Sequence, residues 1–471
     1  MSDSHRDVFE RALEHACSFR DGLSDMPPRP VRSAGELKAL FDGPTPEVGT
    51  DPVAVIDALN AAARPGLTGS PGTRFFGWVI GSSQPAGVAA DMLTSAWGQN
   101  AGAYGTSPAA AMAELISSRW LLDILRLPAE CSVGFVTGAT MAIFSCLAAA
   151  RTAVLARVGW NVEIEGMMGA PRVRVFVGEE AHTTVFAALR YLGFGERVIR
   201  VPSDSQGRMD ASALADILPR GEGPAIVIAQ AGHVNTGAFD PVAAIARTCR
   251  EHEAWLHVDG AFGLWARAVP EMAELTAGLD EAHSWSIDGH KWLQLPYDSG
   301  FAVVRDPEMH RRAQHITASY LPKVSDVEYD PGQFVPELSR RARGFAVWAQ
   351  LRALGRNGIT EMVRHHCALA RRLANRLAGE PGVRVLNEIW LNQVIVSFGN
   401  GSVEERNAAT RATIARIQAD NICLAAGSQW REHWVLRLSV ISAPLEERDI
   451  DRLAVAILSA WRHVQRGGAP M

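Results

Sequence analysis

The chain has 471 residues, of which 47% are hydrophobic and 21% charged, and its formal net charge is −5. These values are typical of an ordinary soluble globular protein with two or three domains. The sequence has no long basic run, which argues against a nucleic-acid partner because phosphate binding needs concentrated positive charge. No stretch approaches about eighteen uninterrupted apolar residues, so we expect no membrane span.

None of the six cysteines forms a CxxC pair, so neither a zinc site of four cysteines nor any other metal site is expected. The first residues are charged throughout and lack the apolar core of a signal peptide. We therefore expect a cytoplasmic protein that keeps its thiols reduced.

Residues 1–70 are expected to form helical pieces, because prolines interrupt the segment repeatedly. The apolar residues between positions 8 and 19 fall on one helical stripe, although the segment has little apolar density of its own. The pattern predicts an N-terminal helical arm that wraps another surface, such as a partner subunit.

Residues 71–343 alternate short apolar runs with amphipathic helical stretches, which predicts a large α/β domain. The predicted strands are Val133–Thr137, Val173–Val177, Val198–Val201, Ala225–Ala229, Trp255–Asp259, His283–Ser286 and Phe301–Val304. Helices are expected at Ala139–Ala150, Thr183–Leu192 and Pro241–His252. Continuous apolar strands alternating with helices indicate a mainly parallel, seven-stranded sheet covered on both faces, whose ligand binds at the carboxyl ends of the strands.

Residues 344–471 are expected to form a smaller α+β domain. A long helical pattern covers Phe345–Leu354 and Gly358–Ala378, and two strands are predicted at Val394–Phe398 and Trp434–Val440.

The stretch "VTGATMA", residues 136–142, places a turn between a predicted strand and a predicted helix. The free N–H groups and the dipole of a helix N-terminus favour a phosphate, and the Thr140 hydroxyl adds a donor. A plain tight turn is the alternative interpretation.

Two polar side chains also follow predicted strands. His182, in "GEEAHTTVF", could stack on an aromatic ligand or move protons, or it could simply cap the following helix. Asp259, in "WLHVDGAFG", ends a buried strand and needs a partner, because an isolated buried charge is costly. Ala261 is small enough for a ligand to approach. A helix cap or an internal salt bridge is the alternative for Asp259.

Lys291 lies in "DGHKWLQLPYDSG", beside a tryptophan and with few other charges. A lysine held in an apolar pocket loses its proton readily and can form a Schiff base with an aldehyde. A buried ion pair with Asp288 or Asp298 is the alternative. Together, the lysine, the carboxylate, the stacking group and the phosphate turn fit one ligand, pyridoxal 5'-phosphate.

The chain resembles the group II pyridoxal-phosphate decarboxylases, relatives of the aromatic amino acid and glutamate decarboxylases, and most closely their bacterial branch. The stretches that carry this resemblance are "NAGAYGTSPAAAMAE", "GFVTGATMA", "EEAHTTVF", "AGHVNTGAFDP", "LHVDGAFG", "DGHKWLQLPYDSG" and "PELSRRARG". The resemblance implies a fold type I, aspartate aminotransferase-like architecture. It also implies a homodimer with its active sites at the subunit interface.

The resemblance also assigns roles to residues of the cofactor site. Lys291 would form the Schiff base, Asp259 would pair with the pyridine nitrogen, and His182 and Ala261 would face opposite sides of the ring. The phosphate would be held by Ala139 and Thr140, with His290 nearby. Tyr320 matches a loop tyrosine of the family thought to return a proton to the α-carbon, although it could also be a core or interface residue.

Two departures from the family put the substrate and the outcome in doubt. His233 and Val234 replace a threonine pair, so Val234 cannot donate a hydrogen bond to the cofactor ring oxygen. His233 is expected to contact the cofactor and brings a titratable group to its site. Asp288 stands where the aromatic amino acid decarboxylases carry asparagine.

We expect decarboxylation of an L-amino acid, the small-molecule substrate, to the amine and CO₂. Oxidative deamination to an aldehyde and β-elimination, for example of a C–S bond, are alternatives on the same scaffold. A regulatory, non-catalytic protein is disfavoured because the sequence shows no helix-turn-helix appendage and no basic tail.

Overall fold

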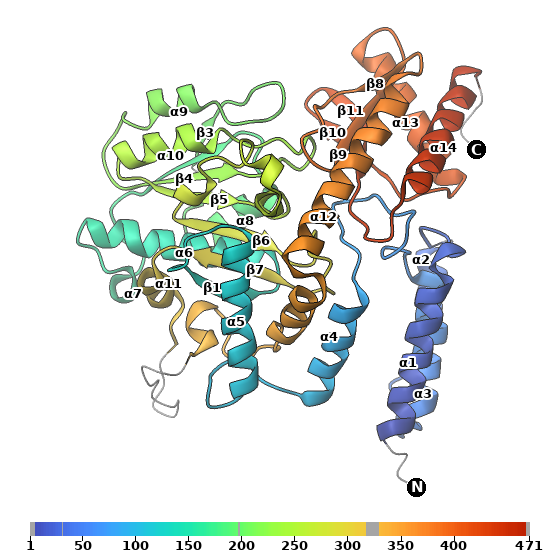
Figure 1. Cartoon of the computed structure of the whole chain (residues 1–471), viewed down its shortest axis with the longest axis horizontal. Helices are drawn as coiled ribbons and strands as arrows, with labels where there is room; N and C mark the ends of the chain where they lie inside the picture. The colour runs from blue at the N-terminus through green and yellow to red at the C-terminus, as the bar shows by residue number, and fades with distance from the viewer. Residues whose placement is uncertain (1–4, 31, 196–197, 317–328, 468–471) are drawn as a thin grey trace.

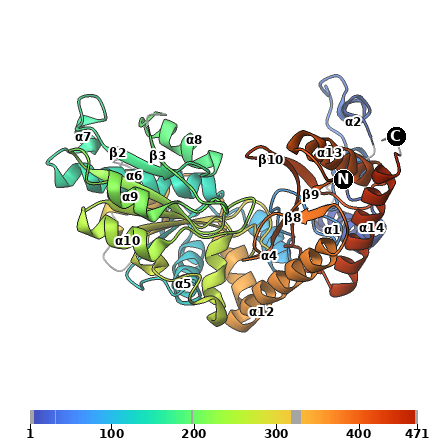
Figure 2. The same ribbon diagram turned by 90° about the horizontal axis from the view of Figure 1, so that it is seen from above.

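The structure is a computed structural model that describes residues 5–30, 32–195, 198–316 and 329–467. Two sheets organise the chain, and Figure 1 shows them side by side with the helix α12 between them. Figure 2 shows α12, Gly344–Ala378, running from the first body to the second. Gly355 has φ 60° and kinks this helix, where the sequence predicts a break.

The first sheet has seven strands in the order β1-β7-β6-β5-β4-β2-β3. β7 runs antiparallel to both of its neighbours, and the remaining pairs are parallel. This arrangement confirms the predicted fold class. The strands are β1 Ser132–Val136, β2 Arg174–Gly178, β3 Ile199–Val201, β4 Ala225–Gln230, β5 Trp255–Asp259, β6 Ser284–Asp288 and β7 Gly300–Val304.

Helices cover both faces of this sheet, which explains why its strands are continuously apolar. Within β4, Ile226 and Ile228 pack on the face that α6 and α8 cover, while Val227 and Ala229 pack into the core on the other face. The helices of this part are α5 Pro108–Ile124, α6 Ala139–Arg157, α7 Val162–Glu165, α8 Thr183–Tyr191, α9 Ala211–Ile217, α10 Val242–Glu251 and α11 Pro307–Gln314.

Helix α6 is long and apolar enough to cross a membrane by length and composition alone. Most of its residues are buried, because it packs across the first sheet and against α8 and α11. The helix is therefore a core helix of the first body.

The second sheet is antiparallel, with the order β10-β11-β9-β8, and has a core of its own. The predicted strands at Val394–Phe398 and Trp434–Val440 correspond to β9 and β11. The sequence pattern missed β8 and β10. The elements are β8 Val383–Val385, β9 Gln393–Phe398, α13 Val403–Ala419, β10 Ala426–Trp430, β11 His433–Ser439 and α14 Glu447–Gln465.

The N-terminal part is helical, with α1 and α3 packed against each other beside the rest of the chain (Figure 1). No residue of α1 or α3 is buried, and Phe9, Leu13, Val55 and Leu59 are each about half exposed. The domain limits at residues 70 and 343 stay a prediction. The helices are α1 His5–Asp21, α2 Ala34–Phe41, α3 Pro52–Ala63 and α4 Pro85–Trp97.

Candidate active site

A cavity of about 400 Å³ opens at the carboxyl ends of β1, β4, β5 and β6. The turns that follow parallel strands meet at this edge of the sheet, where ligands of such sheets bind. The structure brings seven of the predicted site residues into the lining of this cavity: Ala139, Thr140, His182, Asp259, Ala261, His290 and Lys291. Tyr320 lies outside the described residues.

The turn between β1 and α6 forms one end of the cavity. Gly138 is required there, because a Cβ at this position would lie 2.9 Å from His290 Cε1 and 3.1 Å from Asp288 Oδ1. The next residue, Ala139, begins α6, and its N–H donates a 2.6 Å hydrogen bond to Asp288 Oδ1. The backbone thus presents helix N-terminal donors to the cavity, which is the arrangement that binds phosphate groups.

Lys291 is held beside this helix end by an acidic partner. Its Nζ lies 2.8 Å from Asp288 Oδ2, and His290 Nε2 lies 3.3 Å from Asp288 Oδ1. The ion pair with Asp288 that the sequence left open is therefore present, whereas Asp298 pairs with Arg343. The Lys291 side chain keeps 20% of its exposure and lines the cavity, while burial lowers the pKa of His290.

Asp259 lies at the bottom of the cavity and is 6% exposed. Its Oδ1 accepts hydrogen bonds from the Ala261 N–H at 3.2 Å and the Ser286 hydroxyl at 3.3 Å. Burial raises the pKa of Asp259, and the positive charges of His182 and Lys291 oppose that shift. A carboxylate in this environment is stabilised by a cationic N–H partner, such as a protonated pyridine nitrogen.

His182 precedes α8 and is oriented by the first turn of that helix. Its Nδ1 lies 2.7 Å from the Thr184 hydroxyl and also accepts from the Thr184 N–H. The helix-capping role that the sequence left open is therefore real, and the ring still lines the cavity. Burial lowers the pKa of His182, which favours a neutral ring that can stack on an aromatic ligand.

His233 does not line the cavity, in contrast to the prediction that it contacts the cofactor. Its ring is buried and turned toward its own loop, where Nδ1 accepts from the N–H groups of Asn235 and Thr236. Nε2 lies 3.3 Å from Glu180 Oε2, and the same oxygen accepts a 2.7 Å hydrogen bond from Trp430 Nε1 in β10. His233 therefore stabilises a loop and links the first sheet to the second.

Arg340 and Arg341, two of the three arginines of "PELSRRARG", form ion pairs within the protein and do not line the cavity. Arg340 and Glu114 form an ion pair of 2.9 Å in which each side chain is 1% exposed. Arg341 pairs with Asp91 at 2.7 Å. Both arginines therefore anchor this segment.

Of the aromatic residues near the cavity, some are buried in the core and others line the cavity. Phe75 and Phe76 are buried in the core, and Tyr104 is not part of the lining. Trp78, Phe262 and Tyr297 line the cavity. The Tyr297 ring stacks on His290 at a centroid distance of 4.2 Å.

The sequence analysis also missed two polar residues in or near the site, Gln230 and Arg437. Gln230 ends β4 and lines the cavity, and its position after an apolar run is the same signal that identified Asp259. Arg437 belongs to β11 of the second sheet, and its positive charge lowers the pKa of His182. The buried Nε of Arg437 has no hydrogen-bond partner among the described residues. No sequence pattern places Arg437 near this site, because its approach depends on the packing of the two sheets.

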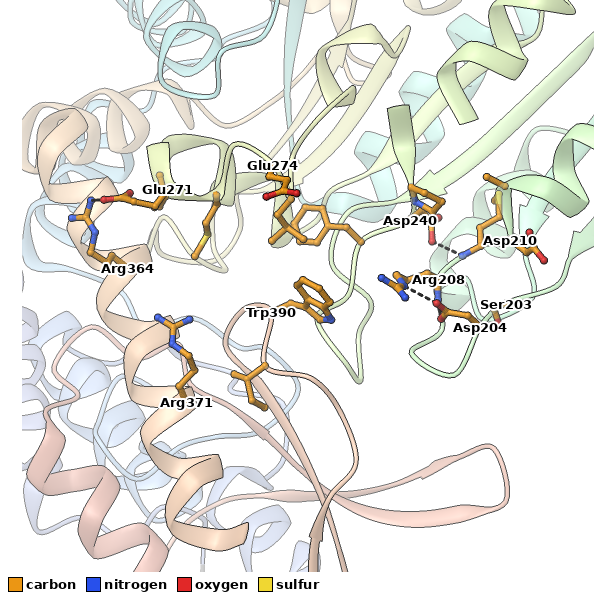
Figure 3. Close-up of a pocket in the computed structure, with 18 residues that line it drawn as sticks. Ser203, Asp204, Arg208, Asp210, Asp240, Glu271, Glu274, Arg364, Arg371 and Trp390 are labelled. Atoms are coloured by element: carbon orange, nitrogen blue, oxygen red, sulfur yellow. Dashed lines mark hydrogen bonds and ion pairs between the residues drawn. The ribbon is translucent and has the colours of Figure 1, made fainter. Parts of the chain in front are cut away.

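A second hollow of about 1110 Å³ lies elsewhere, between loops of the first sheet and the start of the second body (Figure 3). Two of its arginines are paired, Arg208 with Asp204 and Arg364 with Glu271. None of the predicted site residues lines it. The smaller cavity around Lys291 is therefore the candidate active site.

The family described as "Pyridoxal-dependent decarboxylase conserved domain" matches residues 35–398. The chain belongs to this family of pyridoxal-phosphate-dependent carboxy-lyases, and pyridoxal 5'-phosphate is its cofactor. The residues of the cavity fit that cofactor, since they combine a primary amine, a buried carboxylate and a helix N-terminus.

Named relatives cover almost the whole chain. An aromatic-L-amino-acid decarboxylase of Bacillus atrophaeus is 28% identical over 94% of this chain and 92% of its own length. The 4-hydroxyphenylacetaldehyde synthase of Rhodiola rosea is 25% identical over 96% of this chain and 92% of its own length. The crystal structure of Oryza sativa TDC with PLP and tryptamine has a TM-score of 0.92 and 23% identity, covering 98% of this chain and 99% of that one, so it shares the fold.

Proposed function

We propose that the protein removes the α-carboxylate of an L-amino acid as CO₂ and releases the amine. The observation that carries this proposal is the convergence of Lys291, Asp259, His182 and the N-terminus of α6 in one cavity. Pyridoxal phosphate, when bound, supplies an electron sink for the carbanion left by CO₂.

The residues that hold the cofactor follow from the donors in the cavity. The N-terminus of α6 at Ala139 and Thr140 would bind the phosphate, with His290 beside it. Asp259 would pair with the ring nitrogen and keep it protonated. Lys291 supplies the primary amine that the aldehyde requires.

His182 and Ala261 would enclose the ring from opposite faces. The bulky imidazole would restrict the orientation of the substrate, so that the bond to the departing carboxylate stands out of the ring plane. His182 and Tyr320 are the two residues assigned to return a proton to the carbon that loses CO₂. A neutral His182 requires a proton from solvent or substrate before it can donate one, so Tyr320 is the preferred donor.

An aromatic side chain is the substrate class that the cavity favours. Trp78, Phe262 and Tyr297 supply three aromatic rings to its lining. The relative from Bacillus atrophaeus is named as an aromatic-L-amino-acid decarboxylase, which supports the same class. Aromatic pairs add about 0.5–1.5 kcal/mol beyond area burial, enough to select against small aliphatic substrates.

A second outcome is aldehyde formation by decarboxylation with oxidative deamination. The Rhodiola rosea relative is named as an aldehyde synthase and resembles this chain over nearly its full length. We assign the simple decarboxylation because position 320 is a tyrosine that can donate a proton.

We further propose that the protein is a cytoplasmic homodimer. The helices α1 and α3 contact each other and leave apolar residues exposed on both: Phe9, Leu13, Val55 and Leu59. A second copy of the chain would cover this apolar surface. The molar mass in solution, measured by light scattering, tests this assignment.

The function is tested by incubating the purified protein with pyridoxal phosphate and each common L-amino acid, and by assaying CO₂, amine, ammonia and peroxide. Release of CO₂ and amine in equal amounts, lost in Lys291→Ala, supports the proposal. Ammonia and peroxide formed in amounts equal to CO₂ would establish aldehyde synthesis instead. A keto acid and ammonia formed together, without CO₂ or peroxide, would establish β-elimination. Tyr320→Phe is the matched variant, expected to shift products from amine toward aldehyde.

A further inference from the structure

The substituents of the cofactor ring constrain which strand faces its oxygen atom. In pyridoxal phosphate, the carbons that carry the phosphate arm and the ring oxygen lie on opposite sides of the aldehyde carbon, and the ring nitrogen lies across the ring. Asp259 ends β5, Lys291 follows β6 and the N-terminus of α6 follows β1. The strand order β1-β7-β6-β5-β4 puts the phosphate and the lysine on one side of β5. With the ring nitrogen at Asp259, the oxygen edge of the ring would therefore face β4.

Three residues of β4 and its following turn line the cavity: Gln230, Gly232 and Val234. Gly232 has no side chain, and Val234 has no hydrogen-bonding group. Among these three, Gln230 alone carries a side-chain N–H that can donate to an oxygen atom.

The pleat of the sheet places the Gln230 side chain beside Asp259. The two residues are Cα partners in the parallel register of β4 and β5. Ile228, two residues before Gln230, packs on the face covered by α6 and α8, and Trp255, four residues before Asp259, packs on the same face. Since residues two and four apart share a face of a strand, both polar side chains stand on this face and meet at its carboxyl edge.

The side-chain amide of Gln230 is free to bind a ligand. Its backbone N–H donates to Asp240 Oδ2 at 2.7 Å, whereas the side chain makes no hydrogen bond to any described residue. The residue is 8% exposed. The amide reaches the cavity, so a ligand acceptor can take its N–H without displacing a protein partner.

We infer that the side-chain amide of Gln230 donates a hydrogen bond to the ring oxygen of bound pyridoxal phosphate, in the place that Val234 leaves without a donor. This inference rests on the proposed arrangement of the cofactor in the cavity. The oxygen carries negative charge when its proton is released or shared, and a donor stabilises that form. Gln230 is thus a positioning residue for the ring.

The test compares two cofactors on two proteins. Apoprotein and its Gln230→Leu variant are titrated with pyridoxal phosphate and with an analogue that lacks the ring hydroxyl. We expect Gln230→Leu to weaken binding of pyridoxal phosphate about tenfold, as for a charge-assisted hydrogen bond, and to change binding of the analogue less than about twofold. An equal loss with both cofactors, or no loss with either, would overturn the inference.

Two further variants keep the result interpretable. Gln230→Glu preserves the shape but removes the N–H donor at neutral pH, so it should lose affinity for pyridoxal phosphate at least as strongly as Gln230→Leu. Val234→Thr in the Gln230→Leu background places a hydroxyl on the same edge and should restore most of the lost affinity. Retained affinity in Gln230→Glu would contradict the assignment. Far-ultraviolet circular dichroism of each apoprotein confirms that the variants fold.

Absorption spectra supply an independent readout. Without the donor, the proton shared by the ring oxygen and the lysine nitrogen should be released at a pH about one unit higher, which moves the pH midpoint of the visible band upward. An unchanged midpoint would count against Gln230. If wild-type protein binds the cofactor but Lys291→Ala alters neither its spectrum nor its affinity, the proposed arrangement itself fails, which is a different result from a failure at Gln230.

Discussion

Asp288 connects the amine of the active site to the anion-binding helix end, because one of its oxygens lies 2.8 Å from Lys291 Nζ and the other accepts a 2.6 Å hydrogen bond from the Ala139 N–H. A single carboxylate therefore neutralises the lysine and occupies a donor at the proposed phosphate site. This double contact makes Asp288 a determinant of cofactor affinity.

We expect Asp288→Asn to bind pyridoxal phosphate about tenfold more tightly than wild type. The substitution keeps the shape but removes a negative charge that competes with the phosphate for Ala139, and the new amide can donate to that phosphate. It also removes the anion that lies 2.8 Å from Lys291 Nζ. Titration of the apoprotein with cofactor, and separately with inorganic phosphate, measures both effects.

Asp298→Asn is the matched control for this experiment. Asp298 pairs with Arg343 and does not line the cavity, so its substitution should leave cofactor affinity within about twofold. Weaker binding in Asp288→Asn would show that the carboxylate is needed to hold His290 and Lys291 in place.

Arg437 is expected to act on the substrate rather than on the cofactor. Its buried Nε has no partner among the described residues, and its charge lowers the pKa of His182. A substrate carboxylate would satisfy this guanidinium, so Arg437→Gln should raise KM about tenfold or more while cofactor affinity stays unchanged. Steady-state kinetics and a cofactor titration separate the two parameters.

Arg411→Gln serves as the control for Arg437. Arg411 stacks over the Trp434 ring at 5.8 Å and does not line the cavity. Its substitution removes one positive charge from the same domain without touching the site, so KM should not change. A kcat loss in Arg437→Gln with constant KM would contradict substrate binding by this residue.

The buried pair of Arg340 and Glu114 should dominate the stability of the segment that leads into α12. Each side chain is 1% exposed, and Arg340 also donates to the carbonyl oxygens of Ala101 and Phe135. Arg340→Met or Glu114→Gln leaves a buried charge without its partner and should cost about 3–5 kcal/mol. Urea unfolding measures the loss.

The double variant Arg340→Met/Glu114→Gln isolates the ion pair. Its loss of unfolding free energy should be smaller than the sum of the two single losses, because neither charge is then left alone. Strictly additive losses would show that the backbone hydrogen bonds of Arg340, rather than Glu114, determine its contribution.

Much of the fold could be predicted because its strands are buried on both faces. Continuous apolar runs made β4 and β5 visible in the sequence, and the polar residues that follow such runs identified Asp259 and Lys291. The strands β8 and β10 were missed, since one has three residues and the other reads "AGSQW", without an apolar run. Short edge strands of this kind form because β9 and β11 provide a template.

The remaining features of the site depend on side-chain direction and on long-range packing. His233 follows β4 closely in sequence, yet its ring turns away to Glu180, because periodicity does not fix directions in an irregular turn. Arg437 affects His182 from the second sheet. Such contacts between distant segments arise only when both bodies are assembled, so a linear pattern could not reveal them.

Three buried histidines and one partly buried histidine should make the folded protein sensitive to mild acid. Burial lowers the pKa of His257, His310 and His366 to about 3 and that of His283 to about 4. Unfolded histidine has a pKa of about 6.5, so below this pH the unfolded chain binds protons that the folded chain does not. The free energy of unfolding should therefore be highest above pH 6.5 and fall as pH decreases toward 4.

Each of these histidines contributes up to about 1.4 kcal/mol per pH unit within that window. We expect His310→Gln to reduce the slope of unfolding free energy against pH by up to that amount, measured by urea unfolding between pH 7.5 and pH 5. His310 is buried and its Nδ1 contacts the Ser132 hydroxyl at 2.8 Å, so the variant will also lower stability at neutral pH. The slope, rather than the absolute value, is the readout.

His252 is exposed, and His252→Gln should leave the slope unchanged. An equal slope in wild type and His310→Gln would show that His310 takes up a proton in the folded state.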